Sequence, residues 1–128
     1  MNSNASMPPR AVEARWQQLI LTWQRQRDDH EVRAPGSPFP DIVALLEAAR
    51  AEPRLRELFP FTSDHTLRLS TSTTFPYDVQ APAVDPLPDG RFRVCEARSS
   101  RVIGYAASAD EAVRLVTANL PEGLGPAS

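Results

Sequence analysis

Arginine and hydroxyl side chains alternate with apolar residues in two stretches of the sequence, and together they could bind an anion. Arg68 and Ser70 belong to the first stretch, and Arg91 and Arg93 to the second. Neighbouring residues of a strand point to opposite faces of a sheet, so these four would share one face of a common sheet. Guanidinium groups bind carboxylates and phosphates through paired hydrogen bonds. The sequence therefore predicts a face that binds an anionic or polar small molecule. The alternative is a solvated face whose arginines pair with acidic neighbours.

Three further polar residues, Thr62, Ser63 and His65, come just before the first stretch and are expected to join the same face. His65 is the candidate general base, because imidazole titrates near neutral pH. Its neighbour Asp64 would point the opposite way in an extended chain, so their adjacency does not establish a hydrogen-bonded pair. No catalytic set is defined, and whether the protein is an enzyme stays open.

The single cysteine, Cys95, ends the second stretch. It could be a nucleophile if nearby arginines such as Arg93 or Arg98 lowered its pKa, and the alternative is a small packing residue. One cysteine cannot form an internal disulfide. The two histidines, His30 and His65, lack the ligand spacing of a metal site, so neither a metal nor a cofactor is expected.

Two tryptophans, Trp16 and Trp23, lie on the apolar stripe of a helix that the periodicity predicts over residues 10–29. Large aromatic residues on such a stripe usually anchor the core, but they can also form a partner interface or stack on a planar ligand. The sequence leaves these alternatives open.

The elements that would position these groups change type near the middle of the chain. Apolar residues recur every three or four positions before residue 60 and alternate after residue 65, so residues 60–65 are predicted to form the corner between helices and a sheet. A second helix is predicted to begin near Pro40 and to restart at Pro53. Strands are predicted at residues 66–72, 91–96 and 102–106, with a further short one near 83–85 left open.

The last helix is marked by Ser108 and Glu111, which have the spacing of a capping box. The fold class is therefore α+β, with N-terminal helices, a small mostly antiparallel sheet of three to four strands, and a C-terminal helix packed on one sheet face. Residues 1–9 are predicted to be a disordered tail, residues 10–121 a single domain, and residues 122–128 a flexible tail.

Composition excludes several classes of partner. The 128 residues include 14 arginines and 16 acidic residues, for a net charge of −2, which does not favour binding to nucleic acid or an anionic membrane. No apolar run approaches the roughly 20 residues of a membrane span, and the N-terminus lacks the layout of a secretion signal. We therefore expect no nucleic acid, no membrane and a cytoplasmic location.

Several short motifs carry a family resemblance, and they include Leu58-Phe59-Pro60-Phe61-Thr62-Ser63, Leu67-Arg68-Leu69-Ser70, Phe75-Pro76-Tyr77 and Leu120-Pro121-Glu122-Gly123. Together they resemble a family of small actinobacterial proteins of unknown function that carries the label natural product biosynthesis protein. The resemblance covers about residues 41–128 and leaves the first helix largely outside.

What the resemblance implies is a setting, a gene cluster for secondary metabolism, and it supplies no catalytic residues. An accessory protein that binds a small molecule or a biosynthetic enzyme is the favoured function. A small cofactor-free enzyme of the same pathway, such as an isomerase or cyclase, is the first alternative. A regulatory or immunity-type partner protein is the second.

Overall fold

The structure is a computed structural model, and it describes residues 10–128. The disordered tail expected at residues 1–9 lies outside the described residues. Helices come first, strands follow and one helix ends the order, which confirms the α+β class. In chain order the elements are α1 (Arg10–Arg33), α2 (Ile42–Ala51), α3 (Pro53–Arg56), β1 (Phe59–Ser63), β2 (Thr66–Ser70), β3 (Ala83–Pro86), β4 (Phe92–Cys95), β5 (Val102–Ala106) and α4 (Ala109–Ala118).

The strands form one antiparallel sheet of five strands in the order β1-β2-β3-β4-β5, so the expected count of three to four is too low. The missed strand is β1, because residues 60–65, expected to be a corner, form most of β1 and the turn after it. The sequence pattern hid this strand because Pro60 indicates a break. A proline is tolerated at the edge of a sheet, where its missing N–H removes no ladder hydrogen bond, and β1 is an edge strand.

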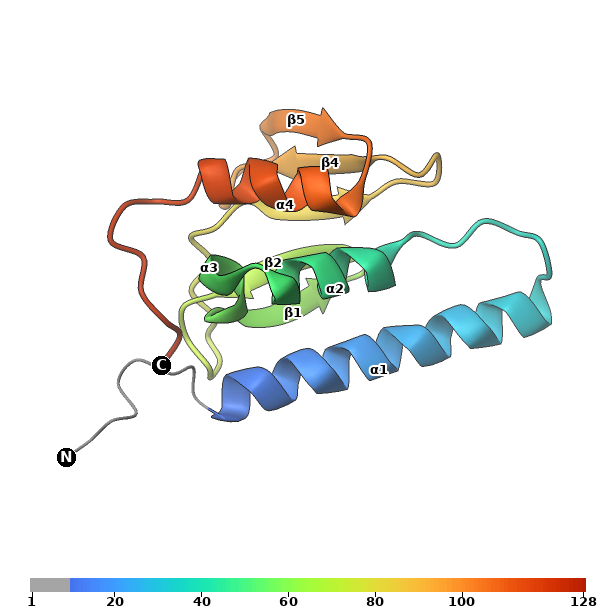
Figure 1. The fold of residues 1–128 in the computed structure, drawn as a ribbon, viewed down its shortest axis with the longest axis horizontal. Coiled ribbons are helices and arrows are strands. Elements are labelled where there is room, and N and C mark those ends of the chain that lie inside the picture. Colours follow the sequence, from blue (N-terminus) through green and yellow to red (C-terminus); the bar gives the residue numbers. More distant parts are fainter. Residues whose placement is uncertain (1–9) are drawn as a thin grey trace.

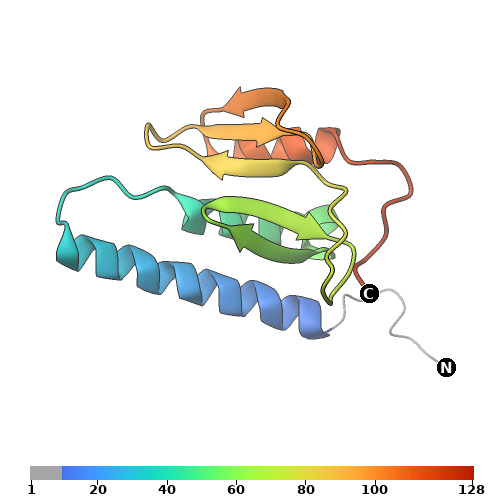
Figure 2. The ribbon, with the colours of Figure 1, turned by 180° about the vertical axis from the view of Figure 1, so that it is seen from behind.

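The helices cover one face of the sheet and leave the other open. In Figure 1, α2 and α4 lie on one face, and α1 runs along the β1 edge. Figure 2 shows the opposite face from behind, with no helix in front of the strands. We call this second surface the open face. The expected packing of the last helix on one sheet face is confirmed, because α4 contacts both β4 and β5.

Trp16 lies in the core between α1 and the link from α3 to β1. Its side chain is fully buried, and its indole Nε1 donates hydrogen bonds of 3.1 Å to the carbonyl oxygens of Arg56 and Leu58. The buried indole thereby satisfies its polar atom while its ring fills the core. Trp16 is therefore a core residue, as the first of the sequence alternatives proposes.

The ladder between β2 and β3 contains only one registered pair, Leu67↔Val84. The chain leaves β2 at Ser70, two residues earlier than expected, and returns as β3 at Ala83. One isolated bridge, Ser70↔Val79, ties this excursion to the end of β2. Residues 71–80, which we call the β2–β3 loop, are thus anchored beside the open face (Figure 2).

The segment 122–128 differs from the expected flexible tail. Ala127 is buried, and its N–H donates to the carbonyl oxygen of Glu57 at 2.9 Å. Ser128 donates to the carbonyl oxygen of Thr71 at 3.1 Å and accepts from the N–H of Thr73 at 3.0 Å. These partners lie more than fifty residues away in the sequence. Local composition therefore could not reveal them.

The capping box at the start of α4 is present. The Ser108 hydroxyl accepts a hydrogen bond from the N–H of Glu111 at 3.1 Å, and Glu111 Oε1 accepts from the N–H of Ala107 at 2.9 Å. The first bond satisfies a backbone donor that the first turn leaves free, and the second fixes the residue just before the N-cap. Within residues 10–128, none of the helices combines the length and apolar composition that a membrane span requires.

Candidate functional site

A pocket of about 760 Å³ lies on the open face, across β2, β3, β4 and the turn that follows β4. The register Asp85↔Arg93 and the pair Leu67↔Val84 place Arg68, Asp85 and Arg93 on the same side of the sheet. This is the arrangement that the alternating pattern predicts for Arg68 and Arg93. We call it the open-face pocket, and its chemically active lining residues are Thr66, Arg68, Asp85, Arg93, Cys95 and Arg98.

Asp85 is the central acceptor of the open-face pocket. Arg93 donates to its Oδ2 from Nε at 3.2 Å and from Nη2 at 3.0 Å, and the Thr66 hydroxyl donates to its Oδ1. The hydrogen bond with Asp85 raises the pKa of Arg93 above its ordinary value. Arg93 therefore pairs with an acidic neighbour, which is the alternative to anion binding that the sequence left open.

Arg68 lines the same pocket but, unlike Arg93, is unpaired. Its side chain is half-buried, yet among residues 10–128 it has no hydrogen bond and no acidic partner within 4.0 Å. The other arginines that line the pocket are both paired, Arg93 with Asp85 and Arg98 with Asp78. Partly burying a charge without a partner costs free energy, so this guanidinium is free to bind an anion.

Ser70, expected to contribute a hydroxyl to the ligand, has another role. The residue is fully buried, and its Oγ accepts from the N–H of Ser72 at 2.9 Å and of Asp78 at 3.0 Å. It also donates to the carbonyl oxygen of Ser72 at 2.7 Å. All three bonds are internal, so Ser70 holds the β2–β3 loop and is not exposed on the open face.

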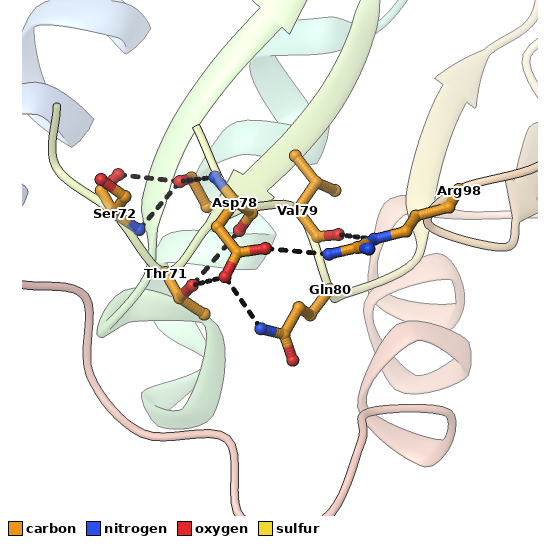
Figure 3. A network of polar contacts seen from close by, with 7 residues as sticks. Thr71, Ser72, Asp78, Val79, Gln80 and Arg98 are labelled. Atoms are coloured by element: carbon orange, nitrogen blue, oxygen red, sulfur yellow. Dashed lines mark hydrogen bonds and ion pairs between the residues drawn. The ribbon is translucent and has the colours of Figure 1, made fainter. Parts of the chain in front are cut away.

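Asp78 joins this loop to the rim of the open-face pocket. Figure 3 shows Thr71, Gln80 and Arg98 converging on its carboxylate, at 3.0, 2.9 and 3.0 Å. Hydrogen bonds from Gln80 and then Thr71 lower the pKa of Asp78, and the charge of Arg98 adds to this. Arg98 also donates to the carbonyl oxygen of Val79 at 3.3 Å, so the network positions one arginine of the rim.

An aromatic group lies on the open face beside Arg68. Tyr77 stacks on Phe61 with 4.5 Å between ring centroids and on Phe59 with 5.6 Å. Phe61 is the direct cross-strand neighbour of Arg68, so their side chains stand next to each other. Phe75, at the tip of the β2–β3 loop, is 84% exposed and meets Tyr77 edge to face. The free guanidinium therefore stands between an aromatic surface and the pocket.

Thr62 and His65 lie away from the open-face pocket. The Thr62 hydroxyl accepts a hydrogen bond from Trp23 Nε1 at 3.3 Å, on the side of α1. The His65 ring lies 5.1 Å from that of Trp23 and 6.0 Å from that of Phe39. His65 and Trp23 therefore belong to one aromatic cluster at the β1 edge, which Phe39 and His30 complete.

Ser63 and Arg91 also lie outside the pocket lining. Ser63 is exposed at the end of β1. Arg91 is exposed, donates to Asp89 at 2.9 Å, and places its guanidinium 5.0 Å from the ring centroid of Tyr105. Of the seven expected ligand-binding residues, the structure thus brings only Arg68 and Arg93 together in the open-face pocket.

Sequence reasoning missed Thr66, Asp85 and Tyr77 as neighbours of the free guanidinium. Asp85 lies in the short strand whose register the sequence left open, so its pairing with Arg93 was not foreseeable. Tyr77 belongs to the Phe75-Pro76-Tyr77 motif, which indicates a loop and contributes to the resemblance but predicts no binding role. Among residues 10–128, no group of three or more His, Cys, Asp or Glu side chains is close enough to hold a metal ion.

A second hollow, of about 600 Å³, lies between α1 and α2 and is also lined by arginines. Arg50 and Arg56 both donate to Glu13 on α1, the latter at 3.1 Å. Burial raises the pKa of Glu13, but the hydrogen bonds from the two arginines outweigh it and leave that pKa below its ordinary value. Both guanidiniums are therefore occupied by one carboxylate.

The comparisons with known proteins give a family and no activity. Neither the curated proteins nor the solved structures provide a match. The sequence profile of DUF6193, described as a family of unknown function, matches residues 10–128. The match includes α1, which the resemblance of the short motifs left largely outside. Because it spans every described residue, the chain belongs to the DUF6193 family.

Proposed function

We propose that this protein binds a small organic carboxylate in the open-face pocket and does not convert it. The observation that carries the proposal is Arg68, a half-buried guanidinium that lines a pocket and has no partner among residues 10–128. A carboxylate would accept two parallel hydrogen bonds from its planar fork and would remove the cost of the unpaired charge.

The charges around the pocket favour a monoanion over a dianion. Arg93 is paired with Asp85, Arg98 with Asp78, and Glu96 has Arg101 at 3.8 Å. Arg68 alone adds a positive charge without an acidic neighbour. A phosphate carries close to two negative charges at neutral pH, so its second charge would meet no free cation. A carboxylate carries one.

The position of His65 favours binding over catalysis. The expected general base packs against Trp23 and Phe39 and does not reach the pocket that holds Arg68. A cofactor-free enzyme, the first alternative, would have to use Asp85, Cys95 or Glu96 as its proton acceptor. Asp85 already accepts hydrogen bonds from Thr66 and Arg93, so both of its carboxylate oxygens are occupied by the protein's own donors.

The biological setting comes from the resemblance of the motifs. It suggests an actinobacterial protein of natural product biosynthesis, in the cytoplasm, whose ligand is a pathway intermediate that carries a carboxylate. A biosynthetic enzyme as partner belongs to the same proposal, whereas a regulatory or immunity-type partner protein is a separate alternative.

Cys95 offers a direct test, because it is the only cysteine of the 128 residues and lines the open-face pocket. We would measure its alkylation by neutral iodoacetamide, using intact mass spectrometry, at increasing concentrations of benzoate or benzamide. Benzoate is expected to slow the reaction and benzamide to leave it unchanged, since only the anion pairs with Arg68. Each alkylation rate is compared with that of the same variant without benzoate or benzamide, so that a change in thiol reactivity is not mistaken for protection by the ligand.

Arg68→Gln is expected to weaken benzoate protection by at least about tenfold, because a hydrogen-bonded charge is worth roughly 1.5–3 kcal/mol. The matched control is Arg114→Gln, at an exposed arginine on α4 that has no ion pair within the described chain. Equal protection in both variants, or equal protection by benzamide, would refute the proposal.

A further inference from the structure

Asp85 lies diagonally across from Arg68 on the open face, yet the two side chains do not pair. The register of β2 and β3 sets Asp85 opposite Thr66, two residues before Arg68. Residues in such a diagonal position have Cα atoms about 7–8 Å apart, which is within reach of a long side chain. Within the described chain, however, no ion pair joins Asp85 to Arg68, and the cation that Asp85 binds is Arg93.

Both carboxylate oxygens of Asp85 are occupied by other donors. Oδ1 accepts a hydrogen bond from the Thr66 hydroxyl, and Oδ2 accepts from Nε and Nη2 of Arg93 at 3.2 and 3.0 Å. The donors come from β2 and β4, on either side of β3, so they hold the carboxylate over its own strand. Only 24% of the Asp85 side chain is exposed, so salt screens its charge less than it would at the surface. A fixed negative charge therefore stands near the free guanidinium of Arg68.

We propose that Asp85 is a specificity-determining residue of the open-face pocket, which admits a monocarboxylate and excludes a ligand with two negative charges. The inference rests on the proposed function, because it requires that a carboxylate binds Arg68. A second anionic group inside the pocket would meet the fixed charge of Asp85. To gain a cation of its own, this group would have to displace Asp85 from Arg93, which costs the original pair.

Glu96 also lines the pocket, but its position gives it less influence on the ligand. Its side chain is 46% exposed, and its Oε2 lies 3.8 Å from Nη1 of Arg101, which is itself exposed. Its Oε1 accepts a hydrogen bond from the Ser99 hydroxyl in the turn after β4. Charges in an exposed turn are screened by water and salt. Asp85 lies inside the sheet, so its charge acts more strongly on a ligand in the pocket.

The test compares two probes of similar size: isophthalate, a dianion at neutral pH, and its monomethyl ester, a monoanion. Protection of Cys95 from iodoacetamide gives the concentration of each probe that halves the alkylation rate, relative to the same variant without probe. The ratio of the isophthalate concentration to the monoester concentration measures charge selectivity. In the wild type we expect this ratio to be about ten, because the second carboxylate finds no free cation.

Three variants should change this ratio in directions that a merely structural role would not produce. Asp85→Asn removes the fixed charge and frees Arg93 for a second anionic group, so the ratio should fall to about one or below. Arg93→Gln leaves the charge of Asp85 uncancelled, so the ratio should rise above the wild-type value. The double variant Asp85→Asn with Arg93→Gln removes the charge and its cation together and should return the ratio to near the wild-type value.

Asp89→Asn is the matched control, because Asp89 also pairs with an arginine, Arg91 at 2.9 Å, but lies outside the pocket lining. It should keep the wild-type ratio, and thermal unfolding verifies that each variant folds. Suppose that the monoester protects the wild type and fails to protect Arg68→Gln. A wild-type ratio near one, or a ratio that neither Asp85→Asn nor Arg93→Gln changes, would then overturn this inference and leave the proposed function intact. Absence of protection by either probe in the wild type would refute both.

Discussion

The hollow between α1 and α2 and the open-face pocket are both lined by arginines, but they differ in how many of those arginines are paired with a carboxylate. Between the helices, one acceptor, Glu13, binds both Arg50 and Arg56. On the open face, Asp85 binds Arg93 and the Thr66 hydroxyl, and Arg68 is left without a partner among residues 10–128. Arginines are therefore paired within the protein in the first place, whereas one arginine in the second is available to bind an anion.

This difference teaches that the number of arginines in a hollow does not identify a binding site. A guanidinium whose donors are already used holds the protein together, and displacing its carboxylate would cost the original pair. When a guanidinium is partly removed from water and unpaired, the binding of an anion lowers the free energy of the protein. The predictions below separate these roles, since the paired arginines should affect stability and Arg68 should affect ligand binding.

The largest effect on stability is expected from Glu13→Gln. The change removes the charge that the half-buried Arg50 and the exposed Arg56 share, and we expect the free energy of unfolding to fall by about 1 kcal/mol. Urea denaturation followed by circular dichroism measures it. Glu47→Gln is the control, because Glu47 lines the same hollow and has no ion pair among the described residues. A loss no greater than in this control would mean that the cluster is not structural.

An effect no larger than this is expected at Arg93. Arg93→Ala leaves Asp85 without its cation and should cost about 1 kcal/mol of unfolding free energy. Arg68→Ala, two strands away in the same pocket, should stay within about 0.5 kcal/mol of the wild type because no pair is lost. The same urea experiment compares them. If Arg68→Ala proved as destabilising as Arg93→Ala, the guanidinium of Arg68 would have a structural partner.

The smallest effect is a pH dependence that belongs to Glu13. Folding lowers the pKa of Glu13 below the ordinary 4.5. The contribution of Glu13 to the free energy of unfolding is therefore fully present above that pH and is lost as the pH falls through the folded-state pKa. The stability gap between wild type and Glu13→Gln should therefore narrow below about pH 4.5. Asp78 and Asp89, whose pKa values are also lowered, stay unchanged in both proteins and cancel in the comparison. A gap that stayed constant in acid would contradict the assignment.

Local sequence signals account for much of the fold. The stripe of Trp16 predicted the first helix, Ser108 and Glu111 marked the start of the last one, and the alternation around Arg68 and Arg93 placed both on one face. These signals work because helix and strand periodicity and helix capping depend on residues within about one turn of each other. In the candidate site, the same local rules placed two of its arginines correctly.

The remaining features depend on contacts between distant residues. Pro60 indicated a break, but it lies in an edge strand, which only the strand order reveals. Ser70 follows the polar side of the alternation, yet the returning β2–β3 loop buries it and uses its hydroxyl. The C-terminal segment pairs with Glu57 and Thr71, although its composition indicates flexibility.

By itself, the sequence determined the α+β class, the main helices and the shared face of Arg68 and Arg93, because these follow from short-range periodicity. Only the tertiary structure decided which arginine is free. The register of β3 brings Asp85 to Arg93 and leaves Arg68 alone, and register is a property of two paired strands that the periodicity of one strand does not determine.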